Sequence, residues 1–338
     1  MLRPFLEKLA TGEELSAQDA HAAMLAILGG EATTPQITAF LMALRVRGET
    51  HQELLGFARA MREKTIRIDA CVTPEPLLDT AGTGGGTGST FNISTVAAFV
   101  LAGAGARVAK HGNRSFSSQC GSADILEQLG VNVGLAPERV GQSIREIGIG
   151  FLYAPSFHPA MKHAHEARKE LGFRTVFNLL GPLTNPAGAM RQLIGAPSPH
   201  AASLMANALA GLGTERSLIV HSRDGLDEVT TTGPTLVFEV AGTEVRSFEW
   251  TPADFGLPVA ALSDLRGGDR SRNAEIARAV LDGAKGPHRD IVLVNSAAAL
   301  LACGLASDLA DGIAQSTHAI DSGAARQKLH QLAEFSRA

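Results

Sequence analysis

Cysteine is scarce in this sequence: Cys71, Cys120 and Cys303 are its three cysteines among 338 residues, and they lie far apart. An odd number of well-separated cysteines excludes the disulfide framework of a small secreted domain. We therefore expect reduced thiols and a cytoplasmic protein. Cys120 lies close to a loop of functional interest, but we interpret it as a packing residue.

An excess of positive charge is also lacking, because 30 Lys and Arg residues stand against 34 Asp and Glu residues and give a net charge of −4. A protein that binds nucleic acid through its phosphates generally carries a basic patch. The composition therefore predicts no nucleic-acid partner. A small polyanionic ligand would have to be bound by local groups.

Long apolar runs are absent as well. No run reaches the roughly 18–20 residues that a membrane-spanning helix needs, so we expect no membrane partner. Residues 1–7 indicate the beginning of an amphipathic helix rather than a signal peptide. What the chain does have is 45% hydrophobic residues, enough for a substantial core. Its length suits one large domain or two unequal ones.

The N-terminal part of the chain has a helical pattern throughout. Ser16 and Asp19 can cap one helix, and Thr50 with Glu53 forms a capping box for another. We predict a small all-helical domain over residues 1–70. Its role is either scaffolding, or closing over a cleft or pairing with another subunit.

From residue 75 onward, short apolar stretches alternate with helical patterns, which is typical of an α/β domain with a mostly parallel sheet. We predict that residues 75–338 form this domain, with helices flanking the central sheet. The predicted strands are residues 77–80, 107–109, 150–153, 193–196, 218–221 and 291–295, with an antiparallel hairpin over 235–240 and 243–250. In such sheets ligands bind beyond the carboxyl ends of the strands.

A glycine-rich loop follows the first predicted strand, within residues 79–95 (DTAGTGGGTGSTFNIST). Glycines let the backbone approach a ligand, and the free N–H groups at the start of the following helix attract anions. The loop lacks the Gly-Lys-Ser/Thr of a P-loop, and its spacing fails the dinucleotide pattern because Thr87 stands where the third glycine belongs. The loop favours a phosphate ligand. A tight strand-to-helix turn is the alternative.

A second loop, within residues 110–124 (KHGNRSFSSQCGSAD), contains a basic pair, an asparagine and four serines. It also lies between a predicted strand and a predicted helix. Two anion-binding loops at successive strand ends suggest a ligand with phosphate at more than one position.

The two loops, in this order, resemble those of the anthranilate phosphoribosyltransferase family. Two further signatures agree: residues 174–186 (RTVFNLLGPLTNP) and residues 224–228 (DGLDE). The resemblance covers essentially the whole chain. It implies that helical segments near residues 159–190 join the N-terminal helices, and that the protein is a homodimer through this helical domain.

The resemblance also implies an activity. The family transfers the phosphoribosyl group of 5-phosphoribosyl 1-pyrophosphate (PRPP) to the amine of anthranilate, with Mg²⁺ and release of pyrophosphate, in tryptophan biosynthesis. Direct displacement with an oxocarbenium-like transition state is expected, without a covalent enzyme intermediate. Two Mg²⁺ ions are expected to accompany the donor.

The resemblance carries over to individual residues in three groups. The expected donor-binding residues are Gly82, Gly85, Gly86, Thr90, Asn92, Ile93, Ser94, Thr95, Lys110, His111, Gly112, Asn113, Arg114, Ser115, Phe116, Ser117, Ser118 and Ser122. The expected metal ligands are Ser94, Asp227 and Glu228, and the expected acceptor-binding residues are Gly82, Asn113 and Arg168. Lys110, Arg168, Asp227 and Glu228 are expected to carry the catalysis.

Each of the main candidates also has an ordinary interpretation. Lys110 could be a surface lysine, Asp227 and Glu228 could form a solvated acidic turn, and Arg168 could be a helix-surface ion-pair residue. His111 and His158 invite an acid–base role, but an aromatic amine is already a neutral nucleophile, so we favour substrate positioning.

The first loop departs from the family pattern at one point. After Gly-Thr-Gly-Gly the family usually has Asp and then Gly, whereas this chain has Gly86 and Thr87. The departure puts the donor affinity or the metal arrangement in question, and it keeps open a family member that binds a ligand or nucleic acid without catalysis. A related transferase or phosphorylase with another acceptor is a separate, enzymatic alternative.

Overall fold

The computed structural model describes residues 2–70, 76–84, 90–115 and 119–338. Within them, a seven-stranded sheet has the order β3-β2-β1-β4-β5-β6-β7. The strands are β1 (Leu77–Gly82), β2 (Arg107–Gly112), β3 (Ile149–Tyr153), β4 (Arg191–Gly195), β5 (Thr214–Ser222), β6 (Thr235–Gly242) and β7 (Glu244–Trp250). Strands β1 to β5 pair in parallel, and β6 and β7 add an antiparallel hairpin at one edge. The predicted fold class is confirmed.

Four helices precede the sheet: α1 (Arg3–Ala10), α2 (Ala17–Leu28), α3 (Thr34–Arg47) and α4 (His51–Lys64). The Ser16 hydroxyl accepts a hydrogen bond from the backbone N–H of Asp19, at 3.1 Å. Thr50 and Glu53 exchange the two bonds of a capping box at the start of α4. Both predicted helix starts are confirmed, because each is set by side chains within one turn of the helix.

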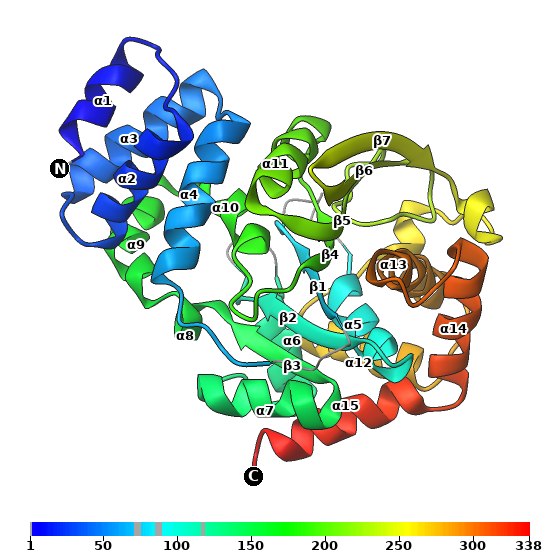
Figure 1. Ribbon diagram of the computed structural model, residues 1–338. Helices are drawn as coiled ribbons and strands as arrows, with labels where there is room; N and C mark the ends of the chain where they lie inside the picture. The colour runs from blue at the N-terminus through cyan, green and yellow to red at the C-terminus, as the bar shows by residue number, and fades with distance from the viewer. Residues whose placement is uncertain (1, 71–75, 85–89, 116–118) are drawn as a thin grey trace.

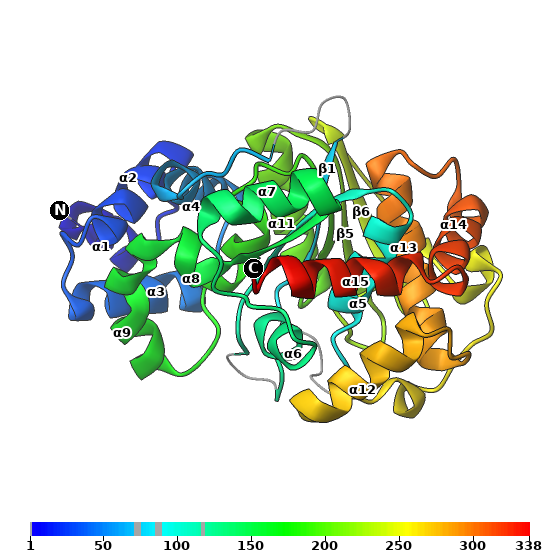
Figure 2. The same ribbon diagram turned by 90° about the horizontal axis from the view of Figure 1, so that it is seen from below.

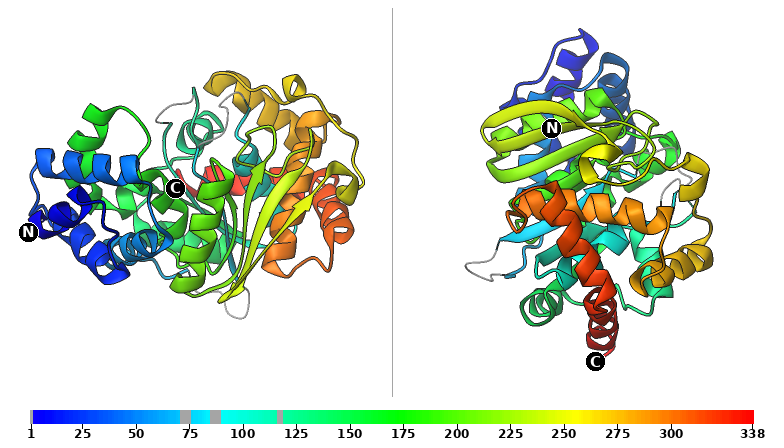
Figure 3. Two further views of the ribbon diagram at one scale, coloured as in Figure 1. Left: turned by 90° about the horizontal axis from the view of Figure 1, so that it is seen from above. Right: turned by 90° about the vertical axis from the view of Figure 1, so that its right-hand side faces the viewer.

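Two later helices pack against these four. They are α9 (Lys162–Leu171), which contacts α2 and α3, and α10 (Phe177–Leu180), which contacts α4. Figure 1 shows α9 beside α1–α4 at the end of the molecule that carries the N-terminus, and the left view of Figure 3 shows the N-terminal helices at that same end. Segments far apart in the sequence therefore share one apolar cluster.

The remaining helices surround the sheet, some packed directly on its strands and others on a further layer of helices. They are α5 (Ile93–Gly103), α6 (Ser122–Gln128), α7 (Pro137–Ile147), α8 (Ala154–Phe157), α11 (Pro199–Leu212), α12 (Arg270–Leu281), α13 (Pro287–Cys303), α14 (Leu309–Asp321) and α15 (Ala324–Phe335). Consecutive side chains of β4 lie on opposite faces of the sheet and belong to different apolar clusters: Leu193 packs with α5 and α13, and Ile194 packs with α11. Figure 2 shows α15 running beside α5 and α7.

One predicted strand is wrong. Residues 291–295 lie inside α13, which begins at Pro287 and is ended by Gly304 in the left-handed conformation. A short apolar run does not distinguish a buried strand from a segment of a buried helix, and here the apolar pattern continues to Cys303. Although α13 is almost fully buried, neither it nor any other helix among the described residues is long and apolar enough to span a membrane.

Candidate active site

A cavity of about 920 Å³ lies at the carboxyl ends of the parallel strands. Gly84 of the first loop, Lys110 at the end of β2 and Asp227 after β5 all line it. The two predicted loops and the acidic pair therefore meet in one place, as expected for the carboxyl edge of a parallel sheet.

Most of the predicted site residues line this cavity. They are Gly82, Thr90, Asn92, Ile93, Ser94, Thr95, Lys110, His111, Gly112, Asn113, Arg114, Ser115, Ser122, Arg168, Asp227 and Glu228. The other five, Gly85, Gly86, Phe116, Ser117 and Ser118, lie outside the described residues, as do Thr87 and Cys71.

Lys110 is not a surface lysine, because only 4% of its surface is exposed. Its ammonium group donates to the backbone oxygen of Thr80, at 2.6 Å, and to the hydroxyl of Ser94, at 3.3 Å. Burial lowers the Lys110 pKa to about 8, although the charges of Asp79 and Glu228 oppose the shift. A cation held at this depth can attract an anionic group without a basic surface around it.

Asp79, the buried acid behind Lys110, ties the strand ends together. Its carboxylate accepts from the backbone N–H of His111, at 3.0 Å, and from the Asn185 amide, at 2.7 Å. The same amide donates to the backbone oxygen of Ala109, at 2.8 Å. Burial raises the Asp79 pKa to about 6, and these bonds and Lys110 limit the rise.

The acidic pair also faces the cavity rather than open solvent. Burial and the neighbouring charge of Asp227 raise the Glu228 pKa to about 8, while Lys110 and a hydrogen bond from the backbone N–H of Ser94 oppose the rise. A bound cation would relieve this repulsion between two adjacent carboxylates.

The chemistry of this donor set fits Mg²⁺. The ion prefers oxygen ligands and commonly uses one or two carboxylates together with substrate phosphates and waters. Asp227, Glu228 and the Ser94 hydroxyl supply oxygens at one wall of the cavity. Within the described ranges, no three His, Cys, Asp or Glu side chains lie close enough together to bind a metal ion by themselves. This holds around His163 and His165 as well.

Two histidines form another wall. The Nε2 atoms of His111 and His158 lie 3.3 Å apart, and both rings are more than nine-tenths buried. Burial lowers the pKa of His111 to about 4, with a further contribution from the charge of Lys110. Burial and the neighbouring His111 lower the pKa of His158 to about 3. Both imidazoles are therefore neutral near pH 7.

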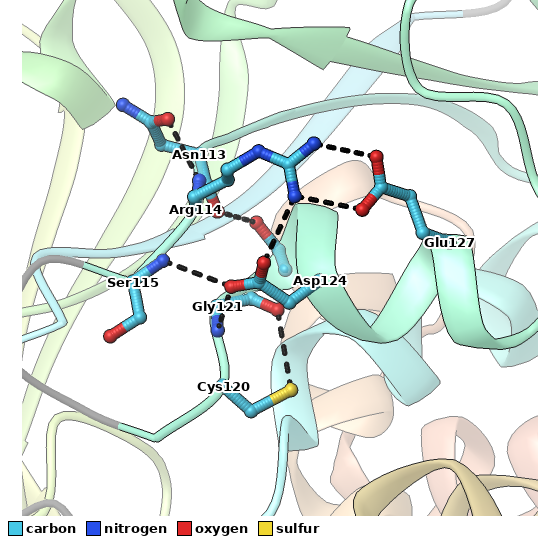
Figure 4. Close-up of polar contacts among 8 residues, drawn as sticks. Asn113, Arg114, Ser115, Cys120, Gly121, Asp124 and Glu127 are labelled. Atoms are coloured by element: carbon cyan, nitrogen blue, oxygen red, sulfur yellow. Dashed lines mark hydrogen bonds and ion pairs between the residues drawn. The ribbon is translucent and has the colours of Figure 1, made fainter. Parts of the chain in front are cut away.

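Arg114, on the cavity wall, is paired with two carboxylates, as Figure 4 shows. Its guanidinium donates to both carboxylate oxygens of Glu127, at 2.6 and 2.7 Å, and to Asp124, at 3.1 Å. Asp124 also accepts from the backbone N–H groups of Ser115 and Gly121, at 3.2 and 2.9 Å. One carboxylate thus joins the two ends of the second loop.

Arg168 lies on α9, on the side of the cavity that the helical group provides. Its guanidinium carbon lies 5.2 Å from the centre of the Phe177 ring. Burial lowers its pKa, but an arginine remains a cation. A planar cation over an aromatic ring is suited to an aromatic carboxylate. Ala154, Pro155 and His158, from the segment after β3, complete this side.

Sequence reasoning missed several residues of the cavity. Arg174 donates to the backbone oxygens of Thr83 and Gly84 and so connects the segment after α9 to the first loop. Asn273 of α12 donates to the Asn92 side chain, at 3.1 Å, and lines the cavity with Arg266, Gly267 and Gly268. The Gly-Gly pair just before the N-cap residue of α12 is the signal that could have indicated a third ligand-facing turn.

Family models match both parts of the chain. Residues 74–326 match the a/b domain of a glycosyl transferase family, and residues 3–65 match the helical bundle domain of the same family.

Individual relatives match over nearly the full length. The chain is 60% identical to the anthranilate phosphoribosyltransferase of Solibacter usitatus, over 99% of this chain and 98% of the relative. The crystal structure of the Thermus thermophilus anthranilate phosphoribosyltransferase is 44% identical, with a TM-score of 0.92 over 98% of this chain and 99% of that chain. The Saccharomyces cerevisiae enzyme in complex with PRPP and Mg is 29% identical, with a TM-score of 0.89 over 99% and 98%.

Proposed function

Because the chain belongs to the anthranilate phosphoribosyltransferases of this glycosyl transferase family, we propose that it transfers the phosphoribosyl group of PRPP to the amine of anthranilate. The products are N-(5-phosphoribosyl)anthranilate and pyrophosphate, and the reaction serves tryptophan biosynthesis. One observation carries the proposal. The first loop, Lys110 and the acidic pair line the same cavity as Arg168, which the helical group contributes.

On the donor side, the N-terminus of α5, Lys110 and Asn92 surround the PRPP. Free N–H groups at a helix start and a buried ammonium both favour phosphate oxygens. Asp227, Glu228 and Ser94 would hold Mg²⁺, which neutralises charge that builds up on the departing pyrophosphate. We expect two ions with the donor, one of them at this acidic wall.

On the acceptor side, Arg168 binds the carboxylate of anthranilate and Phe177 supports the guanidinium. Asn113, at the start of the second loop, lines the same cavity and would contact the acceptor. These residues hold the amine in line with C1 of the ribose, and such positioning supplies much of the rate.

The transfer breaks the bond between C1 and the pyrophosphate oxygen and forms a bond between C1 and the amine nitrogen. Positive charge develops on the ribose, and the nitrogen then releases one proton. His111 and His158 act by positioning, because their buried environment disfavours an imidazolium. The protein's main contribution is electrostatic stabilisation at a preformed site.

The assembly and cellular location are part of the proposal. We infer a helical unit of residues 1–70, joined by α9 and α10, and an α/β unit of residues 75–338. The separate family models that match residues 3–65 and residues 74–326 support the division. A homodimer through the helical unit would cover Val46 of α3, which is 79% exposed.

Cys120 and Cys303 are buried thiols rather than halves of a disulfide, which supports a reducing, cytoplasmic location.

The test is a fluorescence assay of anthranilate consumption with PRPP and Mg²⁺. We expect anthranilate fluorescence to fall, pyrophosphate to appear in equal amount, and the chelator EDTA to stop both until Mg²⁺ is restored. Asp227→Asn should lower the rate strongly, while the exposed Asp264→Asn should not. Constant fluorescence over a wide range of Mg²⁺ would overturn the proposal. Consumption of orthophosphate and a nucleoside instead would identify a phosphorylase.

A further inference from the structure

The turn that carries Asp227 and Glu228 is held in place from behind, by groups that do not line the cavity. Leu226 and Val229, the residues on either side of the acidic pair, are both buried in the main core, with exposed fractions of 1% and 0%. The two apolar side chains point into the core, while Asp227 and Glu228 line the cavity on the other side.

Asp224 fixes the beginning of this turn. Its carboxylate accepts from the backbone N–H of Leu226, at 3.2 Å, and from the hydroxyl of Thr230, at 3.1 Å. The hydroxyls of Ser222 and Thr232 also donate to it. A carboxylate with this many donors is a template for the local backbone rather than a free ligand.

Asn295 of α13 fixes the other end. Its side chain is 1% exposed and its amide makes three hydrogen bonds. The amide oxygen accepts from the backbone N–H of Val229, at 3.0 Å, and the amide nitrogen donates to the backbone oxygen of Val229, at 2.8 Å. The nitrogen also donates to the backbone oxygen of Ile291, at 2.8 Å. One helix side chain thus satisfies both backbone polar groups of the residue that follows Glu228.

We propose that Asn295 is a positioning residue that sets the orientation of Glu228, and through it the affinity for the Mg²⁺–PRPP complex. With both backbone groups of Val229 fixed, the peptide that joins Val229 to Glu228 cannot rotate freely. The Glu228 carboxylate is thereby kept at the backbone N–H of Ser94 and near Lys110. Because this ordering exists before the ligand arrives, binding costs less conformational entropy. The inference rests on the proposed function.

The alternative is that Asn295 only stabilises the core. A buried amide with three partners contributes to stability wherever it occurs, so loss of stability alone does not separate the two roles. A positioning role changes donor affinity and leaves acceptor affinity unchanged. A merely structural role would not affect the affinity for one substrate alone.

The experiment compares Asn295→Ala with Thr214→Val. Thr214 is a matched control because its buried hydroxyl donates to the backbone oxygen of Met190, at 2.8 Å, at the opposite end of β5 from the cavity. Two quantities are measured: the Kd of PRPP by calorimetry at a fixed Mg²⁺ concentration, and the KM values of both substrates. The thermal midpoint is recorded for each protein.

We expect Asn295→Ala to weaken PRPP binding about tenfold, the effect typical of groups that orient metal ligands, with the KM for anthranilate unchanged. Raising Mg²⁺ should recover part of the loss. Thr214→Val should lower the thermal midpoint without changing the Kd of PRPP or the KM of either substrate. An unchanged Kd for Asn295→Ala, or equal losses for both substrates, would overturn the inference.

Two arrangements keep the result interpretable. If Asn295→Ala does not fold, Asn295→Ser retains a polar group in the same place and should give a smaller loss in the same direction. An unchanged Kd for Asn295→Ser then counts against the inference. The wild-type protein is assayed in parallel: inactive wild-type protein contradicts the proposed reaction, whereas active wild-type protein with normal Asn295 variants contradicts only the positioning role.

Discussion

The buried rings of His111 and His158 face each other through their Nε2 atoms, within a chain of polar contacts that has one hydrogen too few. The chain of contacts runs from the backbone oxygen of Gly181 through His111, His158 and the Thr65 hydroxyl to the backbone oxygen of Met61. It has four contacts, but two neutral rings and one hydroxyl supply three hydrogens. One contact therefore lacks a hydrogen bond while the rings are neutral, and burial opposes the extra proton that would complete the chain.

The histidine pair should make the protein sensitive to acid. The pKa of His111, about 4, and that of His158, about 3, lie below the ordinary value of 6.5, so between these limits the unfolded chain binds more protons than the folded one. The histidine pair therefore costs no stability above pH 6.5, and the free energy of unfolding falls as the pH drops toward 4. His158→Asn should remove part of this loss, on the order of 2 kcal/mol at pH 4.5.

The measurement is the urea midpoint of unfolding from pH 7.5 to 4.5. His330→Asn, at an exposed position, is the control and should follow the wild-type curve. Parallel curves for the wild type and His158→Asn would show that the pair does not determine the acid response.

Arg168 should separate the two substrates. Arg168→Ala removes the cation that faces the acceptor side, so the KM for anthranilate should rise at least about tenfold, as expected from the loss of a hydrogen bond to a charged group of about 1.5–3 kcal/mol. The KM for PRPP should change far less. Arg168→Lys should fall between, because it keeps the charge but loses the planar fork. Steady-state kinetics with each substrate varied would test this, and equal rises in both KM values would count against the assignment.

Asp124 and Glu127 should differ in importance although both bind Arg114. Asp124 also joins the ends of the second loop through Ser115 and Gly121, whereas Glu127 has a side chain that is 37% exposed. Asp124→Ala should cost about 1–3 kcal/mol of stability and raise the KM for PRPP. Glu127→Ala should cost about 1 kcal/mol at most, as is usual for a surface ion pair. Thermal unfolding and donor kinetics on the two proteins provide the comparison, and a reversed ranking would contradict it.

Local signals in the sequence predicted local structure well, as the caps at Ser16 and Thr50 show, because their partners lie within one helical turn. The cavity was predicted through motifs that follow strands, and the parallel sheet brings such motifs together. The contact between Asn92 and Asn273 was not predictable in this way, since the two residues are 181 positions apart. The error at residues 291–295 has a related cause: a buried helix in a large core lacks the one-sided pattern by which helices are recognised.

Gly195, at the end of β4, should be essential although it does not line the cavity. A Cβ atom on Gly195 would overlap the backbone oxygen of Asp227 and would lie 2.7 Å from its carbonyl carbon. The turn that carries the acidic pair therefore rests directly on this glycine. Gly195→Ala must displace the turn, and a shift of about 1 Å at a catalytic group can reduce a rate on the order of a hundredfold.

Gly233→Ala is the matched control, because a Cβ there meets no atom within 4 Å. We expect Gly195→Ala to fold with some loss of stability, about 1–3 kcal/mol from overpacking, and to lose most of its activity and its response to Mg²⁺. Gly233→Ala should behave as the wild type. Circular dichroism establishes folding, and the anthranilate assay over a range of Mg²⁺ concentrations gives the rates. Normal activity of folded Gly195→Ala would mean that the acidic turn tolerates displacement, which is incompatible with a preformed metal site at Asp227 and Glu228.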